Sequence, residues 1–217
     1  GKGTAVVIAE QILDARERFN ADCELLGFAF DDHSSGETIN GLPILCGTRE
    51  SWPRYEPYED VRFIFSLYRP DLLRERIALR ESYGIPVSRY YTFVHPLSVV
   101  CRSAHLGNGC VVLAGTVVNA NVRVGHHCTV NSSSLVGHDS VLADSVFVAA
   151  HSCIGSNVKV GTGAFLGLNC SIRNFRTIGD YAIIGMASNV VESVGEGDVV
   201  VGNPARARPS GLSGTIR

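Results

Sequence analysis

The sequence lacks the features that mark several large classes of protein. No apolar run in the 217 residues approaches the length that spans a membrane, and no secretory signal peptide is visible. The net charge is -2 at pH 7, so there is no strongly basic field to attract nucleic acid. The seven cysteines are odd in number and form no Cys-x-x-Cys pair. These absences predict a cytoplasmic protein with no membrane span, no nucleic-acid partner, no disulfide framework and no metal site.

What the sequence has instead is a repeat of six residues. From Val100 to Val190 every sixth residue is Val, Leu or Ile, without an insertion. A small residue stands two positions earlier at most steps, and Cys110, Cys128 and Cys170 are among them, where a reduced thiol acts as a small apolar filler. Glycine directly follows the aliphatic residue at Gly107, Gly125, Gly137, Gly155, Gly161, Gly167, Gly179 and Gly185. A fixed period of this kind is typical of stacked repeat architectures.

A period of six fits neither a helix nor an unbroken strand, but it does fit a short strand followed by a corner. The aliphatic residue then points inward, and glycine or asparagine eases the turn. Three such sides close a triangular coil of eighteen residues, and coils stacked at roughly 4.8 Å bury a continuous apolar column. The pattern resembles the hexapeptide-repeat acyltransferases, which implies a left-handed parallel β-helix. We expect this domain to span residues 93–217.

The first 92 residues carry alternating helix and strand signals, which predict a small α/β domain of the Rossmann-like, nucleotide-binding type. The expected elements are a helix over 5–19, a strand over 23–30, an extended segment over 42–45, a second strand over 61–67 and a helix over 70–83. Pro53 and Pro57 limit any helix near Arg49 to a turn or two. Residues 1–4 (Gly-Lys-Gly-Thr) form either a glycine turn of the kind that follows a strand, although no strand signal precedes them, or a simple lead into the helix.

A small α/β domain, an uninterrupted hexad region and the turn Gly202-Asn203-Pro204-Ala205 together resemble bacterial sugar acyltransferases of the NeuD/PglD type, over nearly the whole chain. The resemblance implies a homotrimer, acetyl-CoA in a groove between neighbouring β-helices, and a nucleotide-linked sugar held by the front domain. A flat face carrying Val111, Val117 and Leu135 is the expected trimer contact. Residues 66–69 (Ser-Leu-Tyr-Arg) depart from the Gly-Asn often found there in that family, which leaves the nucleotide open.

The most specific local match is the stretch from Asn131 to Asp139 (NSSSLVGHD). The resemblance implies that His138 is the general base, that Asp139 orients it and that Asn131 contacts the sugar. The chemistry agrees, because imidazole exchanges protons near neutral pH and a carboxylate fixes its tautomer. One coil is eighteen residues, so Ser156 is expected to stack over His138. Its backbone N–H would then face the thioester carbonyl and stabilise the oxyanion.

Basic residues late in the repeat are candidates for CoA binding. Lys159, Arg173 and Arg176 are suited to contact its phosphates, or else they are ordinary surface charge. Arg176 stands where the repeat otherwise has small residues, so we expect a distorted corner there. The resemblance places the turn containing Gly202, Pro204 and Ala205 near the adenine of CoA.

The front domain offers Gly1, Gly3, Asp31 and Asp32 as candidate contacts to the nucleotide-linked sugar, because acids at a strand's carboxyl end can accept bonds from ribose or base. Three other histidines lie in the repeat, and we interpret them as surface or groove residues rather than metal ligands: His126, His127 and His151.

Together with these residues, the resemblance implies an acetyl-CoA-dependent acyltransferase that acetylates an amine or hydroxyl of a nucleotide-activated sugar by direct transfer, with no metal. No Cys or Ser stands beside His138 as an evident nucleophile, so no acyl-enzyme is expected. Two alternatives remain: an O-acetyltransferase acting on a free or polymeric sugar such as sialic acid, and a non-catalytic trimeric scaffold. The pairing of His138 with Asp139 argues against the scaffold.

Overall fold

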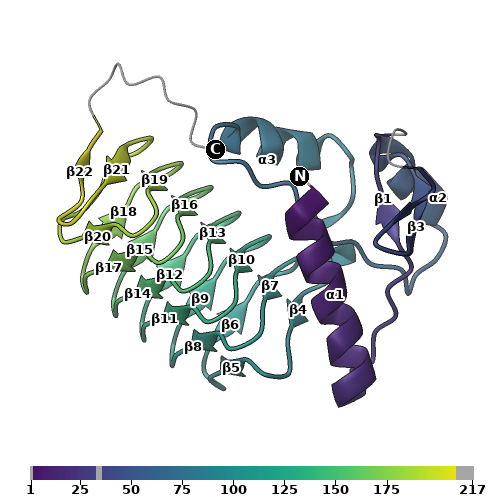
Figure 1. Cartoon of the computed structure of the whole chain (residues 1–217), viewed down its shortest axis with the longest axis horizontal. Helices are drawn as coiled ribbons and strands as arrows, with labels where there is room; N and C mark the ends of the chain where they lie inside the picture. The colour runs from purple at the N-terminus through teal and green to yellow at the C-terminus, as the bar shows by residue number, and fades with distance from the viewer. Residues whose placement is uncertain (1, 33–35, 209–217) are drawn as a thin grey trace.

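A parallel β-helix forms the long axis of the molecule, and a smaller front region packs against one of its sides (Figure 1). The computed structural model describes residues 2–32 and 36–208. The β-helix begins with β4 (Phe93–Val94) and ends with β21 (Val199–Val201) and β22 (Arg206–Ala207). Between them lie two-residue strands at intervals of six residues: β5 (Val99–Val100), β6 (His105–Leu106), β7 (Val111–Val112), β8 (Val117–Val118), β9 (Arg123–Val124), β10 (Thr129–Val130), β11 (Leu135–Val136), β12 (Val141–Leu142), β13 (Phe147–Val148), β14 (Cys153–Ile154), β15 (Lys159–Val160), β16 (Phe165–Leu166), β17 (Ser171–Ile172), β18 (Thr177–Ile178), β19 (Ile183–Ile184) and β20 (Asn189–Val190).

These strands form three flat faces. Face 1 has the strand order β22-β21-β19-β16-β13-β10-β7-β4, face 2 has β20-β17-β14-β11-β8-β5, and face 3 has β18-β15-β12-β9-β6. Between β4 and β20 each strand pairs in parallel with the strand eighteen residues away, as Val136 does with Ile154 on face 2. The predicted triangular coil of eighteen residues is therefore confirmed.

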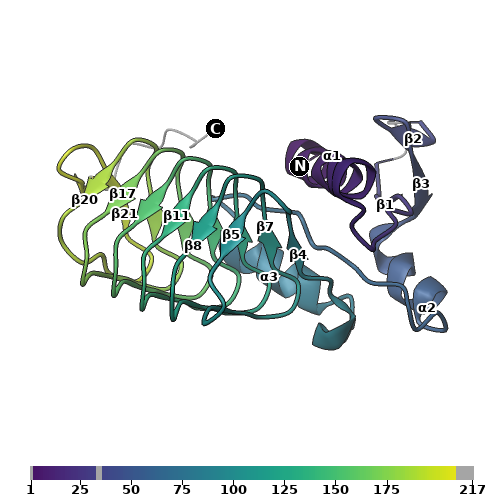
Figure 2. The ribbon, with the colours of Figure 1, turned by 90° about the horizontal axis from the view of Figure 1, so that it is seen from below.

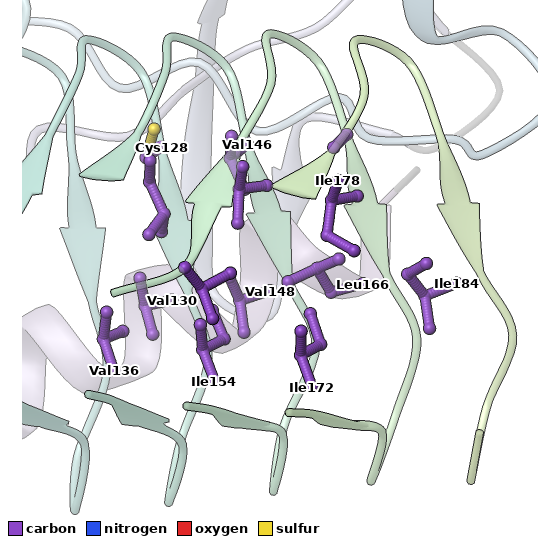
Figure 3. Packing of buried hydrophobic residues seen from close by; sticks show 14 of the residues in the cluster. Cys128, Val130, Val136, Val146, Val148, Ile154, Leu166, Ile172, Ile178 and Ile184 are labelled. Carbon is purple, nitrogen blue, oxygen red and sulfur yellow. The ribbon is translucent and has the colours of Figure 1, made fainter. Parts of the chain in front are cut away.

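The interior of the coil is the apolar column that the repeat predicts (Figure 3). From Val112 to Val190 every sixth residue is buried, whereas Val100 and Leu106 at the open end are partly buried. Fully burying one such side chain stabilises the fold by about 1.5–3 kcal/mol. Because each coil supplies three of them, stability accumulates coil by coil.

The small residues of the repeat have a second role at the corners. Most of the polar ones donate from their hydroxyl to the backbone carbonyl fifteen residues later, as Ser134 does to Ala149 at 3.1 Å and Ser140 to Gly155 at 2.9 Å. The thiols of Cys110 and Cys128 do the same. Carbonyls that the turn leaves without a strand partner are thus satisfied inside the coil.

Arg176 does not distort its corner, and that prediction is wrong. Its Nε donates to the carbonyl of Val191 at 2.8 Å, the same fifteen-residue offset that the small residues use. Phe175 beside it has φ 60°, which matches Asp139 and Asn157 at the equivalent positions, and β17 and β18 keep their pairing. The Nε of Arg176 therefore replaces a hydroxyl as the donor, while Nη1 at the far end of the guanidinium lies at the exposed side, beside the carbonyl of Phe175.

The front region contains α1 (Lys2–Phe19), β1 (Phe28–Ala29), β2 (Thr38–Ile39), β3 (Leu42–Cys46), η2 (Thr48–Glu50), α2 (Ser51–Tyr55), α3 (Leu73–Glu81) and η3 (Val87–Arg89). Its small sheet has the order β1-β3-β2, with β1 parallel and β2 antiparallel to β3. The two helices, the extended segment at β3 and the short helix near Arg49 agree with the predicted elements. Gly84, with φ +67°, follows the end of α3 as a helix C-cap glycine does.

Three expectations for the front region need correction. The predicted strand over 23–30 is reduced to β1, and the predicted strand over 61–67 forms only a bridge between Phe63 and Tyr90, because neither segment has a neighbour along its full length. The second long helix begins at Leu73 rather than Pro70, after a turn in which Leu72 N–H donates to Arg69. Gly3 is part of α1, which among the two alternatives for residues 1–4 favours the simple lead into the helix, and an added Cβ there would meet nothing within 4 Å.

A cavity of about 850 Å³ separates those two extended segments. It is lined by α1 through Ile8 and Ile12, by residues 21–32 and by residues 60–67. No strand of the described residues pairs across it, since β1 pairs only with β3. Among the described residues, this part of the front region is therefore less densely packed than the interior of the β-helix.

Face 1 is covered by the front region (Figures 1 and 2). Phe93, Val111 and Leu113 of the β-helix form one buried cluster with Ile8 and Ile12 of α1. Val111 is consequently buried within the chain and is not on a free trimer face, contrary to our expectation. Val117 and Leu135, which stack on face 2, are only partly buried.

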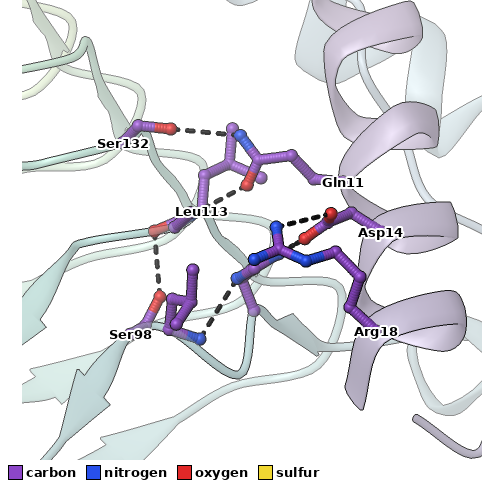
Figure 4. A network of polar contacts seen from close by, with 9 residues as sticks. Gln11, Asp14, Arg18, Ser98, Leu113 and Ser132 are labelled. Carbon is purple, nitrogen blue, oxygen red and sulfur yellow. Dashed lines mark hydrogen bonds and ion pairs between the residues drawn. The ribbon is translucent and has the colours of Figure 1, made fainter. Parts of the chain in front are cut away.

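Polar contacts fix α1 at the corner between faces 1 and 2 (Figure 4). Gln11 donates through Nε2 to Ser132 Oγ at 3.1 Å and accepts through Oε1 from the N–H of Ala114 at 2.9 Å. His95, which is 1 % exposed, accepts at Nδ1 from the N–H of Leu97. Its Nε2 therefore carries the proton and donates to Asp14 at 3.1 Å.

The other side of the front region is fixed at the corner between faces 3 and 1. Arg80 at the end of α3 donates to Ser145 Oγ at 2.8 Å, and the Arg74 guanidinium lies 3.6 Å from the centre of the Tyr181 ring. With α1 at one corner and α3 at the other, the front region leaves the corner between faces 2 and 3 uncovered.

Candidate active site

The uncovered corner between faces 2 and 3 carries His138, two residues after the end of β11. We call this corner the His138 edge and define it by five residues from four successive coils: Asn121, His138, Asp139, Ser156 and Asn174. The backbone N–H of Asn157 donates to the carbonyl of His138 at 3.0 Å, which fixes the histidine coil to the next one. The functional side chains thus rest on a rigid ladder rather than on a mobile loop.

His138 and Asp139 form a close pair that faces solvent. Nδ1 of His138 lies 2.6 Å from Oδ2 of Asp139, and their side chains are 58 % and 42 % exposed. A carboxylate can only accept, so Nδ1 carries the proton and Nε2 presents its lone pair outward. This is the arrangement of a general base held by an orienting acid.

Asn121, one coil earlier, holds the acid in turn. Its Nδ2 donates to Oδ1 of Asp139 at 3.0 Å, so both carboxylate oxygens are engaged. The hydrogen bonds from His138 and then from Asn121 lower the pKa of Asp139 below its usual value. The carboxylate therefore stays ionised at neutral pH, where it can stabilise an imidazolium.

Ser156 stacks over His138, but its backbone N–H already has an acceptor. It donates to Oδ1 of Asn174 at 3.0 Å. The N–H can therefore meet a thioester oxygen only if the Asn174 side chain moves away. The oxyanion role expected for Ser156 remains a prediction with that condition attached.

Asn131 lies at a different corner from His138. It follows β10, at the corner between faces 1 and 2 where Ser132 contacts Gln11, and its Nδ2 donates to the carbonyl of Val148 at 2.8 Å. Face 2 separates the two corners within one chain. The structure therefore does not bring Asn131 and His138 together in a single subunit.

The candidate CoA residues divide into two groups. Lys159 on face 3 and Arg173 on the His138 side of the coil are exposed, whereas the Nε of Arg176 is engaged with the Val191 carbonyl. The turn with Gly202, Pro204 and Ala205 packs against β20, where Asn189 accepts from the N–H of Ala205 and donates to the carbonyl of Gly202. At roughly 4.8 Å per coil, β20 lies about 14 Å along the axis from β11 and its histidine.

In the front region Asp31 and Asp32 line the cavity, at the end of β1. Asp31 accepts from both the N–H and the hydroxyl of Thr48, at 2.7 and 2.6 Å, and so caps the start of η2. Gly3 lies in α1 as described above, and Gly1 lies outside the described residues.

The three other histidines do not form a common site. His151 is exposed and His126 is half-buried, but His127 is buried against the ring of Tyr90 at 4.5 Å, so it is not a surface residue as we expected. Burial, and secondarily the nearby charge of Arg80, lowers the pKa of His127 to about 4. Among residues 2–32 and 36–208 no three His, Cys, Asp or Glu side chains are grouped so that they could hold a metal ion.

Sequence reasoning missed Asn121 and Asn174. Both stand eighteen residues from a residue that it did select, Asn121 before Asp139 and Asn174 after Ser156. The same coil arithmetic that related Ser156 to His138 would have found them.

Several solved structures share this architecture. A histidine-to-asparagine mutant of perosamine N-acetyltransferase from Caulobacter crescentus, in complex with CoA and GDP-perosamine, matches with a TM-score of 0.80 and 24 % identity, covering 95 % of this chain and 93 % of that one. The acetyltransferase domain of PglB from Neisseria gonorrhoeae, in complex with acetyl coenzyme A, matches with a TM-score of 0.80 and 23 % identity, covering 95 % of each chain. WeeI from Acinetobacter baumannii matches with a TM-score of 0.74 and 26 % identity, covering 92 % of this chain and 94 % of that one.

The chain shares their fold. The expected architecture, a front domain followed by a left-handed parallel β-helix, is confirmed by these matches over nearly the full length of each partner. No protein-family model and no curated protein sequence matches the chain. Among the described residues no helix is long and apolar enough to cross a membrane.

Proposed function

We propose that the chain is an acetyl-CoA-dependent acetyltransferase that acts on an amine or hydroxyl of a nucleotide-linked sugar. The observation that carries the proposal is the exposed pair of His138 and Asp139, with its tautomer fixed, on a rigid corner of a β-helix. A structural scaffold has no need of a solvent-facing imidazole held by a carboxylate that is itself held by Asn121. The complexes with CoA, acetyl-CoA and GDP-perosamine formed by proteins of the same fold support the choice of both substrates.

The proposed chemistry is direct transfer. The sugar amine or hydroxyl attacks the thioester carbonyl while Nε2 of His138 accepts its proton. The tetrahedral oxyanion then collapses, breaks the C–S bond and expels the CoA thiolate, which takes the proton from the imidazolium. Asp139 remains ionised throughout and stabilises the imidazolium that forms in between.

The placement of the front region supports a site shared between subunits. In one chain the front region covers face 1, and its cavity residues and Asn131 lie away from the His138 edge. A sugar held by the front region can approach the His138 of a neighbouring copy more readily than that of its own chain. We therefore propose a homotrimer with acetyl-CoA bound between adjacent β-helices, near Lys159, Arg173 and the turn at 202–205.

The test of the function is acetyl transfer from acetyl-CoA to a set of amino and hydroxy nucleotide sugars, followed by mass spectrometry. With the best acceptor, His138→Ala is expected to lower kcat by about 10²- to 10⁴-fold without unfolding the protein. Asp139→Asn is expected to cost less, because it orients the base and transfers no proton. His151→Ala, another exposed histidine of the repeat, serves as the control. Near-normal turnover by His138→Ala would remove the base, and no transfer to any sugar by the unaltered protein would favour the scaffold.

The shared site is tested separately by mixing. Sedimentation is expected to show a trimer at micromolar concentration. If each site needs two subunits, His138→Ala and a front-region variant such as Asp32→Ala will partly restore each other's activity when co-assembled. An active monomer, or no recovery in mixed trimers, would contradict the shared site.

A further inference from the structure

The Asn174 side chain folds down over the coil below its own. Its Oδ1 accepts from the backbone N–H of Ser156, and a Cβ on Gly155 would collide with this oxygen. Because the partner is an N–H donor, the atom that faces it must be the amide oxygen. The Nδ2 group is therefore turned away from Ser156.

The same construction recurs at the corner between faces 3 and 1, but with acids. Asp144 accepts from the N–H of His126 at 2.7 Å, and Asp180 accepts from the N–H of Thr162 at 2.8 Å. Glycine again makes room one residue before each donor. A carboxylate completes this contact as well as an amide does, so the contact alone does not require asparagine.

What asparagine adds is a donor. Its Nδ2 carries two hydrogens, and within the described residues no hydrogen-bond partner is found for them. Asn174 is exposed on the same edge as His138, and its side chain reaches the level of Ser156, one coil above the histidine. The amide that occupies the Ser156 N–H thus offers a donor of its own at the place where the N–H was expected to act.

Resting on the proposed function, we propose that Asn174 is a further catalytic residue: its Nδ2, rather than the backbone N–H of Ser156, donates a hydrogen bond to the thioester oxygen as it becomes an oxyanion. The Ser156 N–H then acts through Asn174, because it fixes the amide orientation and polarises the donor. A preformed donor of this kind, held before substrate binds, is how enzymes stabilise developing charge.

Three variants separate the two donors. Asn174→Ala removes the amide and at the same time frees the Ser156 N–H. If Asn174 is the donor, kcat is expected to fall by about 10²- to 10³-fold, with little change in KM for acetyl-CoA. Asn174→Asp keeps the acceptor for Ser156 but puts negative charge where the donor stood, and is expected to fall at least as far. Asp180→Ala loses the equivalent contact at the opposite corner and controls for the structural cost, with wild-type kcat expected.

A spectroscopic measurement makes the test independent of the sugar. The carbonyl ¹³C resonance of [1-¹³C]acetyl-CoA is expected to shift on binding to the unaltered protein and to Asp180→Ala, and to shift clearly less with Asn174→Ala. Wild-type kcat in Asn174→Ala, or an equal shift in all proteins, would overturn the role of Asn174 and restore the Ser156 N–H. Failure of the unaltered protein to bind acetyl-CoA would instead overturn the proposed function, and this inference with it.

Discussion

The β-helix and the front region fill their interiors in opposite ways. In the β-helix each coil places the same kind of side chain over the last, and from Val112 to Val190 every one of these is buried. In the front region strands of two to five residues surround a cavity of about 850 Å³. The front region also shares its main buried cluster with face 1 of the β-helix. A repeat can supply its own core from one short rule, whereas the front region depends on its neighbour for cover.

The largest expected effect contrasts a buried residue of the β-helix with a partly buried residue that lines the front-region cavity. Leu142, which is 1 % exposed inside the coil, is expected to lose about 2–5 kcal/mol of unfolding free energy when changed to Ala, since the rigid stack cannot collapse around the gap. Ile64→Ala, beside the existing cavity, is expected to cost about 1 kcal/mol, because fewer contacts are lost there. Denaturant midpoints of both variants measure the difference. Equal losses would show that the cavity wall is packed as tightly as the coil.

The second prediction concerns the junction between the regions, where His127 is buried. Its pKa is about 4 in the folded chain, whereas an unfolded histidine titrates near 6.5. Between these values the unfolded chain binds a proton that the folded chain does not. The contribution of His127 to the free energy of unfolding is therefore complete above about pH 6.5 and falls as the pH drops. By pH 4 the loss is on the order of 3 kcal/mol.

Urea unfolding from pH 7 to pH 4 measures this slope. His127→Gln removes the titrating group and is expected to flatten the curve in that window, whatever its effect at pH 7. His151→Gln, at an exposed position, is the matched control and should leave the slope unchanged. Asp14 and Asp139, whose pKa values are lowered by their partners, add acid sensitivity only below about pH 4. An unchanged slope in His127→Gln would show that the ring can charge without leaving its pocket.

The contrast between the regions also explains what the sequence could predict. The repeat fixes the coil because burial, corner and register all recur every six residues, and the same arithmetic leads from His138 to Ser156. The arithmetic could also have placed Asn174 over Ser156, but it says nothing of where a side chain turns, so neither the Asn174 contact nor the fit of Arg176 could be predicted. In the front region, the segment over 61–67 has the composition of a strand, but a strand exists only if a neighbour pairs with it. The burial of Val111 and His127 likewise depends on which face the front region covers, which no local pattern contains.

The smallest expected effect tests whether Arg176 belongs to the fold or to CoA binding. Its Nε satisfies the Val191 carbonyl, as the hydroxyls of Ser134 and Ser140 satisfy theirs. Arg176→Ser restores the residue type of the repeat, and its hydroxyl can reach the same carbonyl, so stability is expected to stay within about 0.5 kcal/mol. Arg176→Ala leaves that carbonyl without its donor and is expected to cost about 1 kcal/mol.

Thermal unfolding compares the stabilities of the two Arg176 variants. The KM for acetyl-CoA is measured in parallel, with Arg173→Ala as the comparison variant at a neighbouring cation. If Arg176 instead holds a CoA phosphate, both substitutions will raise the KM for acetyl-CoA equally, and the two variants will have the same stability. A difference in stability between the two variants with unchanged KM assigns Arg176 to the coil, where its guanidinium takes the place of a hydroxyl as hydrogen-bond donor.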